Sequence, residues 1–365
     1  MKSKNILLSS TAIPSVKIGS WNVLLTNLLK DEPFFFDKII TPESTNKIEN
    51  VNITVKNNRY LKFLFSKLDR FYVKKKFWNC LKGEVDKKDI INVIIFDDIK
   101  ILQTLDHYAR KEKVRENIKI IYFLRGFRFD VDLKTRTAVY NSIDKLIIQT
   151  ETSYKRQVLE NHTIPCEVEI LRNGINSEIF HPLKTAEKKE LRAKLGLKSS
   201  SKYFLWVSQD RPKKGLSIVL KAWKKIIEKQ RNVELLIIGT HQEVKGKQIT
   251  WLERKKNEEL AVYYQATDYY LFSSLCHEGH PLSLTEALKS GAKCLASYIG
   301  PISEVLHNGD LGYLVKNPHF VESWTKAIDT VLNSEINFNK KNIDLQTLYN
   351  NKNWVKQFKE ILKNN

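Results

Sequence analysis

Two glutamates separated by seven residues offer the clearest chemistry in the sequence. The stretch reads Glu278-Gly-His-Pro-Leu-Ser-Leu-Thr-Glu286, and it follows the apolar run Tyr270-Leu-Phe. Gly279 permits a close backbone approach, and Pro281 suits a turn position where no amide donor is needed. The pattern therefore predicts a strand, a tight loop and then the N-terminus of a helix.

The helix after this turn predicts a site for a diphosphate. Its first amides lack helical carbonyl partners and can bind an anion; they belong to Leu282, Ser283 and Leu284. Glu286, about one turn inside the helix, can accept hydrogen bonds from two adjacent hydroxyls, and Glu278 can do the same for a second sugar. Isolated glutamates would be solvated residues, but the spacing and the strand–loop–helix context favour a site.

A second loop concentrates basic residues. It reads Val207-Ser-Gln-Asp-Arg-Pro-Lys-Lys-Gly215 and also follows a strand candidate. Its basic side chains include Arg211 and Lys214. Without structural context, such a lysine-rich loop would simply be solvated.

Short apolar runs alternate with amphipathic stretches along both halves of the chain. Alternation of this kind predicts βαβ units and mostly parallel sheets. The expected strands are Asn5–Ser9, Phe36–Thr41, Val51–Val55, Ile91–Phe96, Lys119–Leu124, Lys145–Thr150, Tyr203–Val207, Val233–Ile238, Asp268–Phe272 and Lys293–Ser297. The expected helices are Ile99–Arg110, Ala186–Leu195, Leu216–Lys229, Ser283–Ser290 and Trp354–Lys363.

The alternation breaks between two α/β halves. Pro165, the turn at Arg172-Asn-Gly and Pro182 mark this hinge. The expected organisation is a Rossmann-like domain over 1–168, a hinge over 169–185, and a second Rossmann-like domain over 186–345. The terminal segment 346–365 is expected to be a helix that packs back on the first domain.

Composition sets the outer limits of the interpretation. The 365 residues contain 61 Lys and Arg against 41 Asp and Glu, a net charge of +20, which suggests an anionic partner. No apolar run reaches about 18 residues, so no transmembrane helix is expected. The four cysteines are widely spaced in the sequence, which suggests free thiols and a cytoplasmic protein.

The second half resembles a known family. The Glu-x7-Glu pair resembles the signature of retaining GT-B glycosyltransferases of glycosyltransferase family 4, the "glycosyl transferases group 1". Arg172-Asn-Gly-Ile-Asn and Phe180-His-Pro resemble the hinge motif of that family, and Leu191–Leu197 resembles the helix that opens its second domain. Gly300-Pro-Ile-Ser-Glu and 309–315 resemble its closing motifs. The resemblance runs from about 144 to 330; before that, only the general layout agrees.

This resemblance implies a fold, a reaction and a set of contacts. The fold would be α/β GT-B, two Rossmann-like domains facing each other across a cleft. The domain over 1–168 would then be the acceptor domain, and the domain over 186–345 would bind the nucleotide-sugar donor. The enzyme would transfer a sugar from a nucleotide-diphosphate sugar, with retention, to a glycan or lipid-linked acceptor in cell-surface polysaccharide or lipopolysaccharide synthesis. Glu286 would hold the ribose hydroxyls and Glu278 those of the donor sugar. His280 would line the donor pocket.

The resemblance also assigns the basic loop and the metal requirement. Lys214 resembles the lysine that neutralises the leaving diphosphate. The family often has an arginine where this chain has Gln209, and Arg211 is the candidate replacement. No metal or other cofactor is expected, because lysine, arginine and helix-end amides supply the charge.

In the first domain the candidates are fewer. Gly19 lies where the family has a glycine-rich loop near the donor phosphates, and Ser20 beside it is an acceptor-side candidate. Arg125 follows a strand candidate and would contact an acceptor or a phosphate; an ordinary strand-end arginine is the equal alternative.

Residues 51–83 concentrate charge and aromatic side chains. They contain nine Lys and Arg, one Asp and seven aromatic residues. Two interpretations are open. The segment forms a helix on an anionic inner membrane surface, with contacts from Lys74, Lys75, Lys76 and Trp78, or it packs in the core with solvated lysines.

Other classes of protein fit less well. A dehydrogenase would need Gly-x-Gly-x-x-Gly after a strand, and none is present. No nucleic-acid-binding motif is present, so nucleic acid is not an expected partner despite the basic charge. Cys276-His-Glu-Gly-His280 is not a His-Glu-x-x-His zinc site. The main alternative is a GT-B protein that binds a sugar nucleotide without catalysis, with a basic nucleic-acid-binding protein the less favoured one.

Overall fold

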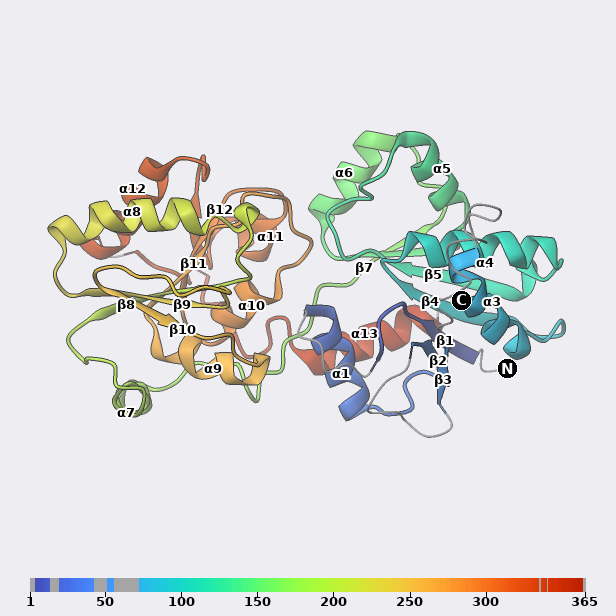
Figure 1. Cartoon of the computed structure of the whole chain (residues 1–365), viewed down its shortest axis with the longest axis horizontal. Helices are drawn as coiled ribbons and strands as arrows, with labels where there is room; N and C mark the ends of the chain where they lie inside the picture. Colours follow the sequence, from blue (N-terminus) through green and yellow to red (C-terminus); the bar gives the residue numbers. More distant parts are fainter. Residues whose placement is uncertain are drawn as a thin grey trace. The chain divides into compact units, whose positions relative to one another are not determined.

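The computed structural model describes residues 4–13, 20–42, 51–55, 72–334, 336–339 and 341–363, without the side chains of 20–23 and 72–73. The chain divides into two compact units (Figure 1). The first comprises 1–171 and 355–365, and the second comprises 172–354. The change at Leu171–Arg172 lies within the segment expected as the hinge.

The described part of the first unit forms a seven-stranded parallel sheet with the order β3-β2-β1-β4-β5-β6-β7. Its strands are β1 (Lys4–Leu8), β2 (Lys38–Thr41), β3 (Asn52–Thr54), β4 (Ile91–Phe96), β5 (Ile118–Phe123), β6 (Lys145–Ile148) and β7 (Glu167–Ile170). Its helices are α1 (Ser20–Asp31), α3 (Tyr72–Leu81), α4 (Ile99–Lys111), α5 (Leu133–Asn141), α6 (Glu151–Asn161) and most of α13 (Asn351–Lys363).

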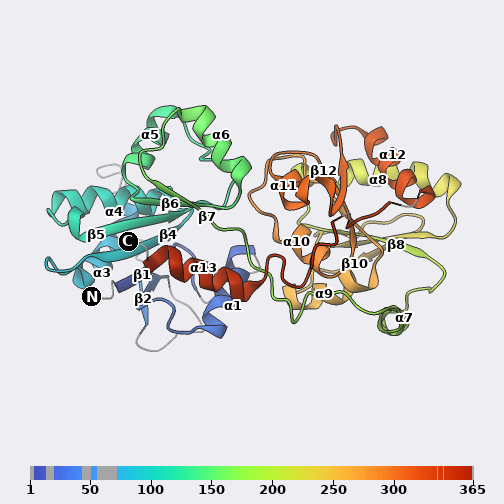
Figure 2. The same ribbon diagram turned by 180° about the vertical axis from the view of Figure 1, so that it is seen from behind.

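Helices cover both faces of this sheet, as a buried parallel sheet requires. Helices α3 and α4 pack on one face, and α1 and α13 lie on the other in both views (Figures 1 and 2). Phe358 of α13 contacts the rings of Phe96 and Phe123 at the ends of β4 and β5. Buried Lys145 donates to the carbonyl of Ile361 near the end of α13. The final helix is thus an integral part of the first unit.

The described part of the second unit is also a parallel sheet with helices on both faces. Its six-stranded sheet has the order β10-β9-β8-β11-β12-β13, and its pairs are parallel. The strands are β8 (Lys202–Val207), β9 (Val233–Ile238), β10 (Ile249–Leu252), β11 (Tyr269–Phe272), β12 (Lys293–Ser297) and β13 (Gly312–Val315). The helices are α7 (Thr185–Lys194), α8 (Leu216–Lys229), α9 (Asn257–Ala266), α10 (Leu282–Lys289), α11 (Ile302–Val305) and α12 (Val321–Asn333).

The two faces of this second sheet belong to separate apolar clusters. Helices α8 and α12 cover one face, where Trp223 and Trp324 are fully buried. Helices α9, α10 and α11 cover the other face (Figure 1). The Rossmann-like α/β organisation expected from the sequence is confirmed in both units.

In each sheet the strand order reverses at one point. In the second unit this point lies between β8 and β11, which are neighbours in the sheet but far apart in the chain. Open parallel sheets bind ligands beyond the carboxyl ends of the strands at such a reversal. The two loops singled out in the sequence, after β8 and after β11, both leave from this point.

The segment 51–83 is described only in part. Trp78 on α3 is 1% exposed, and its indole nitrogen donates to Glu112 over 2.7 Å. Lys74 pairs with Asp98 at 3.1 Å, and Lys75 lies over the ring of Tyr108. The prediction of Trp78 as a membrane contact is therefore wrong, because this side chain belongs to the core.

The rest of that segment stays a prediction. Lys76 is half-buried on α3, and residues 56–71 lie outside the described residues. No helix in the described part of the chain is both long and apolar enough to span a bilayer.

Candidate functional site

The loops after β8 and β11 meet through a lysine and a glutamate. The Lys214 ammonium donates to Glu278 Oε1 at 2.5 Å, although the residues are 64 positions apart. Ser274 donates to the same carboxylate oxygen at 2.6 Å. Both charged side chains are about one-fifth exposed. An accessible ion pair thus stands at the switch point of the second sheet.

The backbone behind Lys214 is held firmly. Ser273 Oγ donates to the carbonyl of Lys214 at 2.8 Å and accepts from the indole N–H of buried Trp206. Leu275 N donates to the carbonyl of Lys213 at 2.7 Å. These contacts join the loop after β11 to the end of β8 and to the loop that follows it, so they fix the backbone that carries Lys214.

Gly215 makes this close contact between the loops possible. Its φ is +73°, and a Cβ atom there would lie 2.1 Å from the carbonyl oxygen of Ser273. Any larger residue would have to push the two loops apart. The close contact between the loops therefore requires a glycine at position 215, which the Lys-Lys-Gly sequence alone did not show.

Helix α10 begins one residue before the expected start at Ser283. Pro281 occupies its N-cap position, and the helix runs from Leu282 to Lys289. The amides of Leu282, Ser283 and Leu284 form the first turn, where no preceding helical carbonyl can satisfy them. Gly279, in the loop before it, is buried. The helix N-terminus follows directly on the loop that carries Glu278.

Glu286 lies one turn inside α10 and is 3% exposed. Its Oε1 accepts a hydrogen bond of 2.7 Å from the side-chain amide of Asn257, the first residue of α9. Burial raises the pKa of Glu286 to about 7, while hydrogen bonding from Asn257 opposes this shift. Such a carboxylate changes charge near neutral pH and can accept hydroxyl groups when ionised.

Asn257 was missed at the sequence level. It lies 29 residues before Glu286, in a polar stretch of the sequence that has no motif of its own. Only the packing of α9 beside α10 brings the two together, so no local pattern could have revealed the contact.

His280 is not placed as expected. It is 3% exposed, and its ring packs edge-on against Tyr349 with 4.7 Å between ring centroids. Its carbonyl accepts from the side-chain amide of Asn173 at 2.6 Å. Burial, with Arg172 nearby, lowers the pKa of His280 to about 3, so the ring is neutral. This geometry argues against a donor contact through the ring and assigns His280 to the support of the loop.

Arg211 is exposed in the same loop as Lys214, at the start of a short 3₁₀ turn. Its carbonyl accepts from the amide of Lys214 at 2.8 Å, so the two residues are joined through the backbone. Its role in place of an arginine at position 209 stays a prediction.

In the first unit, Arg125 follows β5 and pairs with Asp97, which follows the neighbouring strand β4, at 3.1 Å. Arg125 is 40% exposed in this pair. Burial raises the pKa of Asp97, and the Arg125 charge opposes the rise. Gly19 lies outside the described residues, and so does the side chain of Ser20, the first residue of α1.

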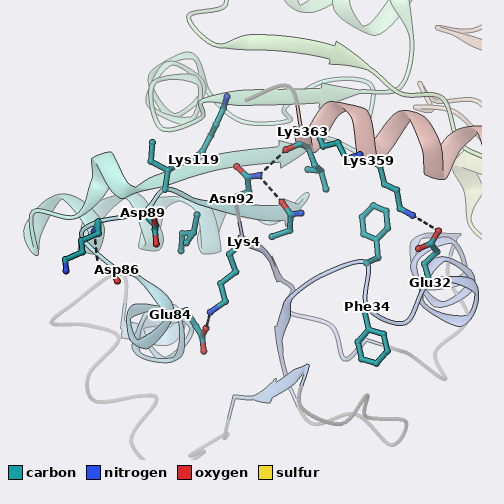
Figure 3. A pocket seen from close by; sticks show the side chains of 16 residues that line it. Lys4, Glu32, Phe34, Glu84, Asp86, Asp89, Asn92, Lys119, Lys359 and Lys363 are labelled. Carbon is teal, nitrogen blue, oxygen red and sulfur yellow. Dashed lines mark hydrogen bonds and ion pairs between the residues drawn. The ribbon is translucent and has the colours of Figure 1, made fainter. Parts of the chain in front are cut away.

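A pocket of about 1290 Å³ opens in the first unit, at the amino ends of β1, β4 and β5 (Figure 3). Lys4 pairs with Glu84 and Lys359 pairs with Glu32 along its wall. Its charges are of both signs and are partly neutralised by these pairs. The pocket lies at the opposite ends of these strands from the loops that carry Asp97 and Arg125.

No three His, Cys, Asp or Glu side chains among the described residues come together as a metal site. The expectation of a metal-independent reaction stays a prediction.

Comparison with known proteins follows the same division of the chain. Residues 187–346, most of the second unit, match the family model "Glycosyl transferases group 1". A D-inositol 3-phosphate glycosyltransferase of Mycobacterium ulcerans is 25% identical over 212 residues, which cover 54% of this chain and 44% of the relative. An N-acetyl-alpha-D-glucosaminyl L-malate synthase of Bacillus anthracis is 25% identical over 247 residues, 64% of this chain and 63% of the relative. The chain thus spans about half the length of several curated relatives it matches.

Solved structures agree over nearly the whole chain. Sucrose-phosphate synthase from Thermosynechococcus elongatus superposes with a TM-score of 0.76 at 16% identity and covers 98% of both chains. Anabaena Alr3699/HepE in complex with UDP and glucose gives 0.73 at 14% identity and covers 99% of both. The fold is therefore GT-B. Together with the family match, it supports a group 1 glycosyltransferase.

Proposed function

We propose that this protein is a retaining glycosyltransferase that moves a sugar from a nucleotide-diphosphate sugar to a glycan or lipid-linked acceptor. The observation that carries the proposal is the meeting of Lys214 and Glu278 between two loops at the switch point of the second sheet. This ion pair stands at the position where an open parallel sheet binds ligands.

In the proposed complex, the donor contacts come mainly from the second unit. Ionised Glu286 accepts the two ribose hydroxyls, and the first-turn amides of α10 bind the diphosphate. Glu278 accepts hydroxyls of the donor sugar. Lys214 is then shared between Glu278 and the diphosphate, so donor binding replaces part of an existing ion pair rather than exposing a free charge.

The reaction breaks the bond between the anomeric carbon and the diphosphate oxygen. The acceptor hydroxyl adds to the same face of the sugar, and its proton passes to the departing phosphate oxygen. Negative charge grows on the diphosphate as the bond breaks. Lys214 and the α10 amides stabilise that charge, which is the main catalytic task, and Arg211 is the further cation proposed for it. Because these groups supply the positive charge, the proposed reaction does not call for a metal.

The donor base and the acceptor are finer parts of the proposal. The Anabaena neighbour is described as a complex with UDP and glucose, which makes UDP-glucose the first donor to test. Acceptor recognition is assigned to the first unit, with Arg125 and Ser20 as candidates. A role in cell-surface polysaccharide or lipopolysaccharide synthesis belongs to the same proposal, as does contact with the inner membrane surface through Lys74, Lys75 and Lys76.

A turnover assay tests this function. The purified protein is incubated with UDP-, GDP- and ADP-sugars and a mixture of simple glycoside and prenyl-phosphate acceptors, and the release of nucleoside diphosphate is measured with the anomeric configuration of the product. We expect one donor to react with retention, and we expect Lys214→Ala and Glu286→Gln to lose that activity. Binding of a nucleotide-sugar without turnover across the acceptors would favour the non-catalytic alternative.

A further inference from the structure

Lys289 is a buried cation in the helix that carries Glu286. It is the last residue of α10, and none of its surface is exposed. Its ammonium group donates to three backbone carbonyls, at 2.8 Å to Leu345, 3.0 Å to Gln346 and 2.7 Å to Leu348. An ammonium has three hydrogens to donate, so each of them has a partner.

The three carbonyls belong to one turn, and residues 344–350 are called the strap here. Asp344 organises the turn: its Oδ1 accepts from the amide of Gln346 at 2.8 Å, and its carbonyl accepts from Leu348 at 3.1 Å. In the hydrogen bonds described for the Lys289 ammonium, every acceptor is a backbone carbonyl. Backbone dipoles therefore take the place of a counter-ion.

The strap also reaches the loop before α10. Tyr349, the residue after these carbonyls, packs its ring on His280. Its carbonyl accepts from the amide of Ile175 at 2.7 Å, which joins the strap to the start of the second unit. One segment thus contacts α10 at its C-terminal end through Lys289 and the preceding loop through His280.

Burying a lysine costs free energy unless its hydrogen bonds are complete. A leucine or methionine there would remove all three bonds: the carbonyls of Leu345 and Leu348 would lose this donor, whereas the carbonyl of Gln346 also accepts from Ser177 at 3.1 Å. The complete set of bonds indicates that the residue sets the position of the helix end rather than merely filling space.

We propose that Lys289 is a positioning residue for donor binding, which ties α10 to the strap and so fixes Glu286 and the first-turn amides at the diphosphate. It touches no substrate. This inference rests on the proposed function, because it concerns the same donor site.

The Lys289 ammonium can lose a proton within the pH range of a binding experiment. Burial lowers the pKa of Lys289 to about 8, and Asp344 in the strap opposes the shift. Below this pH the ammonium makes three bonds. Above it the neutral amine has two hydrogens to donate, so one of the three bonds to the strap is lost. Donor affinity should therefore decline as the pH rises above 8.

The test measures equilibrium binding of UDP-, GDP- and ADP-glucose by calorimetry from pH 7 to 9.5, using whichever of them the wild-type protein binds. We expect Lys289→Met to weaken binding about tenfold at pH 7 while turnover at saturating donor changes less than about threefold. Lys289→Arg keeps a charge that does not titrate in this range. It should recover part of the affinity and show no decline at high pH. Lys224→Met, which removes an exposed lysine of α8, is the matched control and should bind as wild type.

Asp344→Ala tests the route from the exposed side of the strap, with Lys289 itself unchanged. Its side chain is fully exposed to solvent, so the variant should fold, and loosening the strap should weaken donor binding about threefold. In the Lys289→Met background it should have no further effect, since its influence passes through Lys289.

The outcomes separate the two claims. If the wild-type protein binds no nucleotide-sugar, the proposed function fails. If the wild-type protein binds a nucleotide-sugar and Lys289→Met binds it equally well, only the positioning role fails. The positioning role also fails if wild-type affinity does not decline between pH 8 and 9.5 and the losses of affinity in Asp344→Ala and Lys289→Met add up in the double variant.

Discussion

The charge state of Glu286 should control donor binding near neutral pH. In the proposed complex this carboxylate must be ionised to accept two ribose hydroxyls. Burial raises the pKa of Glu286 to about 7 in the free protein. The first experiment therefore changes only the pH, from 6 to 8, and uses the wild-type protein.

The size of the effect follows from that pKa. Roughly one-tenth of the carboxyl groups are ionised at pH 6 and roughly nine-tenths at pH 8. If only the ionised form binds, the apparent dissociation constant of the donor should fall about tenfold over this interval. A nucleotide-sugar suits the measurement, because its diphosphate diester does not change charge between these values.

Calorimetry in buffers of different ionisation enthalpy reports both the affinity and the protons exchanged. At pH 7 we expect about half a proton to be released for each donor bound. Glu286→Gln should bind weakly at every pH and release no proton. Asn257→Ala removes a hydrogen bond that stabilises the carboxylate, so its midpoint should move to higher pH. Equal affinity of the wild-type protein at pH 6 and 8, without proton release, would refute the reasoning.

The raised pKa of Glu286 also predicts how the stability of the free protein depends on pH. The folded state holds the proton of Glu286 up to about pH 7, whereas the unfolded chain releases it near 4.5. The native state therefore binds more protons between these values, and the stability contribution is lost as the pH rises through about 7. The shift corresponds to about 3 kcal/mol in the free energy of unfolding, and Glu286→Gln should remove that part of the pH dependence.

Three further substitutions test particular contacts. Lys214→Ala should lower kcat about 100-fold through loss of one charge that stabilises the leaving group. Lys213→Ala, at the exposed neighbouring residue, should change kcat by less than about threefold. Equal losses of kcat in the two variants would contradict the assignment. Gly215→Ala should destabilise the second unit by more than Gly196→Ala in thermal unfolding, because both have positive φ but only at 215 would a Cβ meet another atom within 4 Å. Trp78→Ala should lower the free energy of unfolding by about 3–5 kcal/mol, as removal of a buried tryptophan does, and a variant as stable as wild type in denaturant titration would show that the side chain is not in the core.

The interior strands of both sheets could be predicted because they are buried on both faces. Runs such as Ile91–Phe96 and Val233–Ile238 are continuously apolar because helices cover both sides of each sheet. Of the four edge strands, β3 was predicted, whereas β7, β10 and β13 were missed. Glu167–Ile170 alternates charged and apolar residues over only four positions, and Ile249–Leu252 is equally short, so neither has a pattern that separates it from a loop.

The site shows the same limit more clearly. Glu278 and Glu286 could each be proposed from the residues around them, because strand–loop–helix context is local, whereas Lys214 was proposed from the family resemblance. The Lys214–Glu278 pair needed the sheet order, since β8 and β11 become neighbours only through the topology. His280 was misjudged for a related reason: a histidine beside glutamate and glycine has the pattern of an open loop, and Tyr349, 69 residues later, buries it.

The segment around α3 shows why composition alone is ambiguous. Aromatic residues at helical spacing among lysines suit both a membrane surface and a core helix. In the described part of this segment Trp78 is a core residue, because it lies against helix α4 and donates a hydrogen bond to Glu112, which directly follows α4.

The central claim is that the second unit binds a nucleotide-diphosphate sugar at the switch point where Lys214 and Glu286 are held. Equilibrium binding of UDP-, GDP- and ADP-sugars to the wild-type protein, Lys214→Ala and Glu286→Gln tests it most directly. We predict saturable binding of a donor with one preferred base, weakened about tenfold or more in both variants. Binding that is equally tight in all three proteins would contradict the account, and so would the absence of binding by the wild-type protein.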